Sequence, residues 1–183
     1  MLQNDLDTVC EWADRWQMKF NGPKCKVMHF GRKTTGIEWY YMYGEPVEEV
    51  CSIKDLGVLF SNDMKVSLNC RDSYSKANRM LGLISRTIRY RYPTVLLNLY
   101  KSLVRPHLDY CSSVWNPYYI KDIELLERVQ HRFTRLFSEL RSLPYDDMVR
   151  QLGLLWSLQE RRNRTDLIEL FKLVIGFSGT PWN

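Results

Sequence analysis

The chain has 183 residues, 45% of them hydrophobic and 26% charged, and it carries a net charge of +5. This balance is that of a globular protein with one domain or two small ones, and it excludes an intrinsically disordered chain. No apolar run approaches the ~20 residues that a membrane span needs, which predicts no membrane partner.

The cysteines and histidines show no metal-binding pattern. The cysteines are odd in number and none stands at the spacing of a zinc site; they are Cys10, Cys25, Cys51, Cys70 and Cys111. The three histidines are far apart in the sequence. We interpret the cysteines as reduced thiols of an intracellular protein, cytoplasmic or nuclear, and expect no metal site in this chain. The polar and acidic start of the sequence predicts no signal peptide.

The first third of the chain combines one helical pattern with short strand patterns. Apolar residues at helical spacing predict an amphipathic helix over residues 2–18. Apolar segments then predict strands over residues 25–30, 37–43, 47–50 and 53–60. One helix on a small antiparallel sheet is an α+β arrangement, and we expect it to form a first domain that covers residues 1–62.

The apolar period changes to that of helices at Ser61-Asn62-Asp63. The sequence predicts a second, all-helical domain over residues 63–183, with prolines or polar turns between its helices. The expected helices cover residues 68–88, 95–103, 108–115, 123–137, 144–152 and 158–174.

A glycine lies inside the last predicted strand of the first domain, Ile53–Phe60. Apolar residues alternate along this run as they do on one face of a strand. A glycine within a strand marks a bulge or a close approach by another backbone or by a ligand. The segment Lys54-Asp55-Leu56-Gly57-Val58 is therefore either an ordinary strand or a strand whose Gly57 backbone faces a nucleic-acid strand.

The span Ser73–Leu108 contains bases and no acid. Its bases are Lys76, Arg79, Arg86, Arg89, Arg91, Lys101 and Arg105. Such a run is either a solvated face or a surface that contacts a phosphate backbone. Tyr90 and Tyr92 could pack on a sugar or stack on a base. We expect Arg86 and Arg89, three residues apart on one predicted helix face, to act together.

Two further motifs are ambiguous on spacing alone. Lys24 follows Asn21-Gly22-Pro23 and would be an exposed lysine in a turn. The adjacent carboxylates Asp146 and Asp147 could hold a metal ion, but Pro144 precedes them and apolar residues follow at helical spacing. Acids just after a proline stabilise the first turn of a helix through its dipole, and we expect that role here.

Several motifs stand in the order in which one family of polymerases has them. They are Trp12 and Trp16 on the first helix, Asn21-x-x-Lys24-Cys25, Lys54-Asp55-Leu56-Gly57-Val58, Leu99–Tyr110, Trp115-Asn116-Pro117, Leu126–Arg135 and Leu158–Leu167. Nearly the whole chain thus resembles the C-terminal palm and thumb of reverse transcriptases from non-LTR (LINE, jockey-like) retrotransposons. The resemblance implies a partial palm over residues 1–62 and a thumb over residues 63–183.

The resemblance also implies roles for the motif residues. Lys54–Val58 would be the primer-grip strand, with the Gly57 backbone turned toward the primer. Lys24 would act as the general acid that protonates the leaving pyrophosphate. The bases of Ser73–Leu108 would contact an RNA/DNA primer–template duplex.

The metal-binding aspartates of this family precede the residue that is Met1 here, so we expect this chain to lack them. Two-metal phosphoryl transfer needs such carboxylates. The resemblance therefore implies a C-terminal fragment of an RNA-directed DNA polymerase that binds nucleic acid and is inactive alone. The Mg²⁺ of the intact family enzyme would have no site here, and the missing fingers and palm would be a partner. The alternative is a non-catalytic helical module for protein or RNA interaction.

Overall fold

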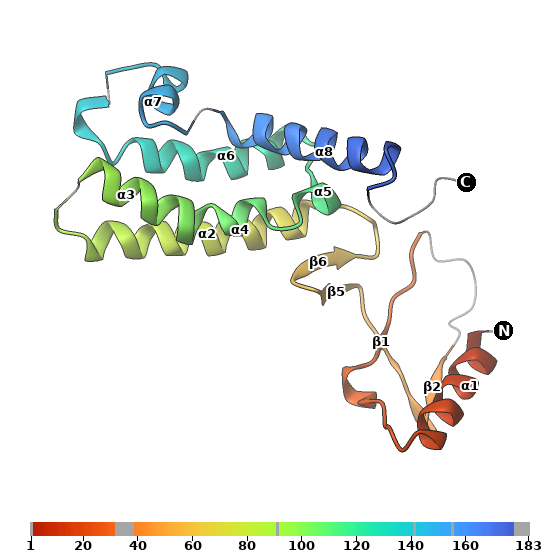
Figure 1. The fold of residues 1–183 in the computed structure, drawn as a ribbon. Coiled ribbons are helices and arrows are strands. Elements are labelled where there is room, and N and C mark those ends of the chain that lie inside the picture. Colours follow the sequence, from red (N-terminus) through yellow and green to blue (C-terminus); the bar gives the residue numbers. More distant parts are fainter. Residues whose placement is uncertain (1, 32–38, 91, 141, 155, 178–183) are drawn as a thin grey trace. The chain divides into compact units, whose positions relative to one another are not determined.

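The elements of the chain fall into two units, Met1–Lys65 and Val66–Asn183. The structure is a computed structural model that describes residues 2–31, 39–90, 92–140, 142–154 and 156–177 (Figure 1). A helix and short strands form the described part of the first unit, and helices form that of the second. This arrangement confirms the α+β class predicted from the sequence.

The first unit begins with a helix that packs on short strands. Its elements are α1 (Leu2–Arg15), the 3₁₀ turn η1 (Gly22–Lys24), β1 (Lys26–Val27), β2 (Tyr41–Met42), β3 (Glu45–Pro46), β4 (Glu48–Glu49), β5 (Ser52–Asp55) and β6 (Val58–Ser61). α1 ends earlier than predicted because the chain becomes left-handed at Gln17, where φ is 54°. Ile37, in the predicted strand 37–43, lies outside the described residues.

The described strands pair two by two rather than in the single antiparallel sheet that the sequence predicts. β2 pairs with β3 and β5 with β6 in antiparallel fashion, whereas β1 pairs with β4 in parallel. The cause lies in one continuous segment that changes partner: Val47 N donates to Tyr40 O (2.8 Å), and Val50 N donates to Val27 O (2.9 Å). The segment thus passes from β2 to β1 within a few residues.

α1 packs on β2 through both apolar and polar contacts. Cys10, Met42 and Val47 form the buried centre of the first unit. The Gln3 side chain exchanges two hydrogen bonds with the backbone of Tyr41: Nε2 donates to the carbonyl oxygen at 2.9 Å, and Oε1 accepts from the N–H at 2.8 Å. The amide therefore acts as a strand neighbour for β2 and fixes α1 against the strand.

The predicted strand Ile53–Phe60 is wrong, because the chain reverses in the middle of it. β5 and β6 form a hairpin whose register pairs Asp55 with Val58. The two residues between them, Leu56 and Gly57, have φ of 44° and 88°. Positive φ at both central residues is typical of the type I′ two-residue hairpin turn, and glycine adopts it without strain. The glycine therefore marks a turn and not a bulge.

The second unit consists of helices in its described residues. They are α2 (Ser67–Thr87), α3 (Pro93–Leu99), the π-helical segment η2 (Tyr100–Val104), α4 (Pro106–Asp109), α5 (Ser112–Trp115), α6 (Ile120–Thr134), the 3₁₀ turn η3 (Ser138–Leu140), α7 (Tyr145–Gln151) and α8 (Leu158–Val174). The single helix expected over residues 108–115 is divided because Cys111 is left-handed, with φ of 50°.

α2 and α6 lie side by side and run in the same direction (Figure 1). Near their N-termini, Ser67 Oγ donates a hydrogen bond to Asp122 Oδ2. Eleven residues further along α2, Asn78 Oδ1 accepts a hydrogen bond from Arg132 of α6. The segment α3–η2–α4 and α8 run the opposite way, so the unit has the alternating directions of a helical bundle.

A stacked aromatic pair and a polar network hold the centre of this unit. The rings of Tyr100 and Phe133, both fully buried, are stacked with their centres 4.1 Å apart. Tyr100 Oη donates to Gln130 Oε1 (3.0 Å), and Gln130 Nε2 donates to Tyr145 Oη (3.0 Å). Tyr145 Oη in turn donates to Glu127, which ties η2, α6 and α7 together. Burial raises the pKa of Tyr100 and of Tyr145, so both phenols stay protonated donors.

Candidate nucleic-acid interface

In the structure, acids from just outside the acid-free run Ser73–Leu108 pair with two of its bases. Lys76 Nζ lies 2.5 Å from Asp72 Oδ2, and Arg105 Nε lies 3.6 Å from Asp109 Oδ2. Both acids stand immediately outside the run in the sequence. Two of the predicted phosphate-binding bases therefore already have a carboxylate partner, and they are less available to bind a phosphate.

The prediction that Arg86 and Arg89 lie on one helix face is wrong. α2 ends at Thr87, and Ile88 is extended, with φ of −86° and ψ of 106°. Arg89 therefore follows the helix instead of continuing its face. The chain cannot remain helical far beyond this point, because Pro93 disfavours the helical conformation in the residue before it.

Arg79 and Arg86 lie seven residues apart on one exposed face of α2. The Arg86 side chain folds back along the helix, because its Nη1 lies 3.9 Å from the position that a Cβ on Gly82 would take. The guanidinium therefore covers this buried glycine. Lys101 is half-buried in η2, and Arg91 lies outside the described residues.

α6 adds an arginine to this face that the sequence analysis missed. Arg132 Nη1 donates a hydrogen bond to Asn78 Oδ1 of α2. Asn78 lies one turn before Gly82 on α2. The side chain of Arg132, from α6, and that of Arg86, from α2 itself, therefore lie over adjacent turns of α2. Among the described residues, no ion pair joins Arg79, Arg86 or Arg132 to an acid. We call these three residues the arginine surface.

A signal for the α6 arginines was present in the sequence. Arg128, Arg132 and Arg135 recur at spacings of four and three, which places them on one side of the predicted helix. A search for acid-free runs passes over them because the same helix contains acids. One of these acids, Glu127, turns inward: both of its carboxylate oxygens accept the N–H of Leu158 at the start of α8. The sequence of α6 therefore suggests more acidic side chains beside these arginines than the structure places there.

Two arginines of the motif near the C-terminus, one buried and one half-buried, contact their own unit. Arg162 is 1% exposed; its Nη2 donates to Leu108 O (3.3 Å), and its guanidinium carbon lies 5.6 Å from the ring centre of Trp115. Burial lowers the pKa of Arg162. Its neighbour Arg161 pairs with Asp109 at 3.1 Å. Both residues attach α8 to the segment α4–α5.

The predicted primer-grip residues lie on the β5–β6 hairpin instead of on one strand. Lys54 and Asp55 are exposed on β5, and Val58 is buried on β6. Leu56 is 84% exposed beside Gly57 at the turn. The tip of the hairpin thus presents a bare glycine backbone and one apolar side chain, which suits contact with a sugar face or with protein.

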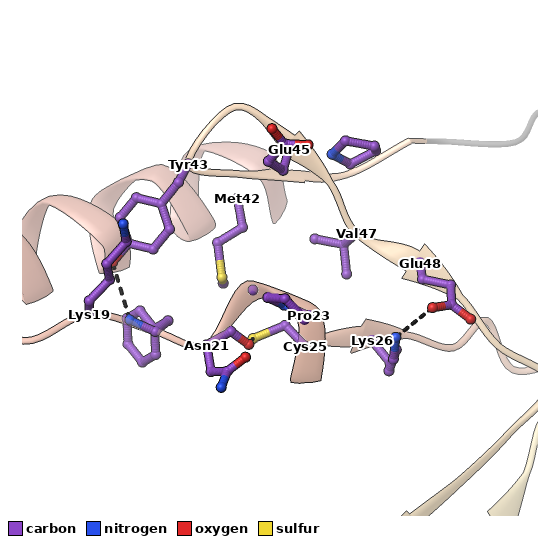
Figure 2. A pocket seen from close by; sticks show the side chains of 13 residues that line it. Lys19, Asn21, Pro23, Cys25, Lys26, Met42, Tyr43, Glu45, Val47 and Glu48 are labelled. Atoms are coloured by element: carbon purple, nitrogen blue, oxygen red, sulfur yellow. Dashed lines mark hydrogen bonds and ion pairs between the residues drawn. The ribbon is translucent and has the colours of Figure 1, made fainter.

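A cleft of about 720 Å³ opens on the first unit between η1 and the strands β2–β4 (Figure 2). Lys26 Nζ in this cleft lies 2.5 Å from Glu48 Oε2, and Lys19 Nζ lies 5.7 Å from the ring centre of Tyr43. The Glu48 carboxylate balances one of these charges, and a second acid, Glu45, also lines the cleft, so its two lysines are matched by two acids. Lys24 is exposed at the end of η1 and does not line the cleft. The cleft therefore lacks the unbalanced positive charge of an anion site.

The described residues show no metal centre. Within them, no group of three or more His, Cys, Asp or Glu side chains could hold an ion. Asp146 and Asp147 lie in the first turn of α7 behind Pro144, as the sequence predicts. The five cysteines are free thiols, and burial beside the charge of Asp122 raises the pKa of Cys70 to about 12. Within the described part of the chain, no helix is long and apolar enough to cross a membrane.

The proteins that the chain resembles are RNA-directed DNA polymerases of mobile elements. The chain is 25% identical over 117 residues to the RNA-directed DNA polymerase from mobile element jockey of Drosophila melanogaster, a match over 62% of this chain and 13% of that polymerase. It is 23% identical over 140 residues to the probable RNA-directed DNA polymerase from transposon X-element of the same organism, over 75% of this chain and 15% of that protein. No family model and no solved structure matches the chain.

These matches confirm the resemblance to reverse transcriptases of jockey-like elements that the motifs indicate. They also fix its extent, because the chain spans only 13–15% of the length of these curated relatives. The chain is thus similar to one segment of such a polymerase.

Proposed function

We propose that this chain is the C-terminal palm-and-thumb segment of an RNA-directed DNA polymerase, and that it binds the primer–template duplex without carrying out the chemistry. The first unit would be the partial palm and the second the thumb. The Mg²⁺ ions and the carboxylates that hold them would belong to the remaining polypeptide of an intracellular polymerase. Two features support this assignment: the similarity to polymerases of mobile elements and the arginine surface.

The arginine surface is the observation that carries the proposal. Arg86 and Arg132 approach adjacent turns of α2, and no described acid pairs with either of them. Guanidinium groups bind phosphate oxygens in a bidentate fashion, and two such groups one helical turn apart match successive charges along a nucleic-acid backbone. Such contacts carry no base information, so binding should not depend on sequence. That behaviour suits an enzyme that must hold every template it copies.

The first unit would hold the primer and the rest of the polymerase. The hairpin tip at Gly57 would allow a primer strand to approach its backbone, and Lys24 would protonate the leaving pyrophosphate. One face of α1 and the residue after it remain exposed, with Val9 at 43%, Trp12 at 50% and Trp16 at 63%. Indole rings in this position are typical of an interface, and we assign the face to the polypeptide that contains the fingers and the catalytic palm strands.

Titration of a labelled RNA/DNA hybrid with the purified chain at several salt concentrations tests this function. Neutralisation of three or four phosphates predicts that log affinity falls with log salt with a slope of about −3. A hybrid of unrelated sequence should give the same affinity and slope. Absence of binding at low salt would contradict the proposal and would favour a module for protein interaction.

A further inference from the structure

The C-terminal half of α8 carries an apolar face that the described residues of its own unit leave exposed. The helix starts inside the unit: Leu158 is fully buried, and the Ser157 side chain forms a capping box with Glu160. Beyond Asp166 the apolar side chains emerge. Their exposed fractions are 66% for Leu167, 43% for Ile168, 49% for Leu170, 61% for Phe171, 68% for Val174, 46% for Ile175 and 81% for Phe177.

The spacing of these residues is that of a helix seam. Leu167, Leu170 and Val174 are separated by three and four residues, as the a and d positions of a coiled coil are, and Phe177 follows just beyond the end of the helix. The remaining three extend the same face to one side. The opposite side of the helix is polar and charged, and there Lys172 Nζ lies 2.7 Å from Glu169 Oε1. α8 is therefore amphipathic over a stretch whose apolar side the described residues of its unit leave largely exposed.

We propose that a second copy of this chain packs on the C-terminal face of α8, so that two α8 helices meet about a two-fold axis. A two-fold interface uses the same patch twice, and this patch contains no charged side chain. Two copies therefore meet there without bringing like charges into contact, although each chain carries a net charge of +5. The proposal does not depend on nucleic-acid binding.

The size of the patch suits such a dimer. A standard interface buries about 800 Å² on each partner. Complete burial of a phenylalanine removes about 150–250 Å² from water, and more than half of that surface is still exposed on both Phe171 and Phe177. With five aliphatic side chains beside them, the patch approaches the area that a stable pair needs. Soluble monomers rarely expose contiguous apolar patches larger than a few hundred Å².

The charges on α8 argue against a lipid surface as the occupant of this face. A helix that lies on an anionic membrane presents lysines and arginines along its polar side. Here the polar side beyond Asp166 offers Lys172, and Glu169 balances its charge. A second protein surface fits this neutral arrangement better than acidic headgroups do.

Sedimentation and light scattering of the full chain over a concentration series test the proposal. The wild-type mass should rise from 21.9 kDa toward twice that value. Phe171→Glu should keep the chain monomeric, or raise the dimer dissociation constant at least tenfold, because it places a charge within the exposed apolar face. Thr165→Glu adds the same charge on the polar side of α8 and should behave as the wild type does.

A second variant tests the interface even if Phe171→Glu fails to fold. Phe177 follows the last helical residue and is 81% exposed, so Phe177→Ser should weaken the dimer without a change in helicity or thermal unfolding. A wild-type chain that stays monomeric at every concentration would overturn the proposal. The proposal would also be overturned if Thr165→Glu dissociated the dimer as strongly as Phe171→Glu does. Binding to anionic vesicles that requires Phe171, by a chain that remains monomeric in solution, would assign the face to lipid instead.

Discussion

Replacement of both Arg86 and Arg132 by alanine is the most direct test of the arginine surface. Each arginine that neutralises one phosphate contributes about −0.9 to the slope of log affinity against log salt. The double variant should therefore reduce a slope near −3 to about −1. If the contacts contribute nothing at 1 M salt, the same rule predicts that the dissociation constant at 0.1 M salt rises about 60-fold. Titration of a fluorescent RNA/DNA hybrid at four or more salt concentrations gives both quantities.

A matched control separates a local effect from the loss of net charge. Lys121 and Arg150 are exposed on α6 and α7, outside the arginine surface, so Lys121→Ala/Arg150→Ala removes the same charge elsewhere on the helical unit. This control should keep the wild-type slope. The variant Arg86→Lys/Arg132→Lys keeps the charge and should restore most of the slope, with weaker binding because lysine lacks the guanidinium fork. Equal slopes for the double variant and the control would refute our assignment of the surface.

Three further predictions concern stability and activity. Burial lowers the pKa of His131 below its usual 6.5, so the neutral form is favoured in the folded state; stability should be complete above about pH 6.5 and fall as the pH decreases below it. His131→Phe should flatten this dependence in denaturant unfolding at pH 5 to 7, whereas an unchanged profile would exclude His131 as its source. Gly57→Val should destabilise the hairpin by about 1–2 kcal/mol because a β-branched residue is strained at φ of 88°, and faster amide exchange in β5 and β6 would show it. The chain alone should extend no primer on an RNA template with Mg²⁺ or Mn²⁺; incorporation that Asp146→Ala/Asp147→Ala abolishes would contradict the helical role of these two acids.

The helices of the second unit could be predicted because apolar residues at helical spacing are buried along most of them. Leu81, Leu126 and Phe133, each 1% exposed or less, are examples. The same periodicity cannot tell which part of an apolar face finds a partner. It predicts α8 correctly, yet Leu158 is buried at one end of the stripe and Val174 is exposed at the other. Burial depends on neighbours that the local pattern does not contain.

The hairpin and the arginine surface escaped the sequence analysis for different physical reasons. At the hairpin, Leu56 occupies a left-handed position that usually belongs to asparagine, aspartate or glycine, so the turn lacks its common signature. The arginine surface depends on helix packing, because Arg86 and Arg132 are far apart in the sequence and lie over adjacent turns of α2 only through the packing of α6 on α2. A linear search for charge runs cannot detect such a pair.

The parallel arrangement of α2 and α6 has an electrostatic consequence for the arginine surface. Peptide dipoles add along each helix and leave about half a negative charge at its C-terminal end. Because both helices point the same way, their negative ends lie at the same end of the pair. Arg86 and Arg132 stand in the last turns of these two helices. The dipoles therefore favour positive side chains at this end of the helix pair, where the backbones of Arg86 and Arg132 lie. Two antiparallel helices would lack this shared negative end.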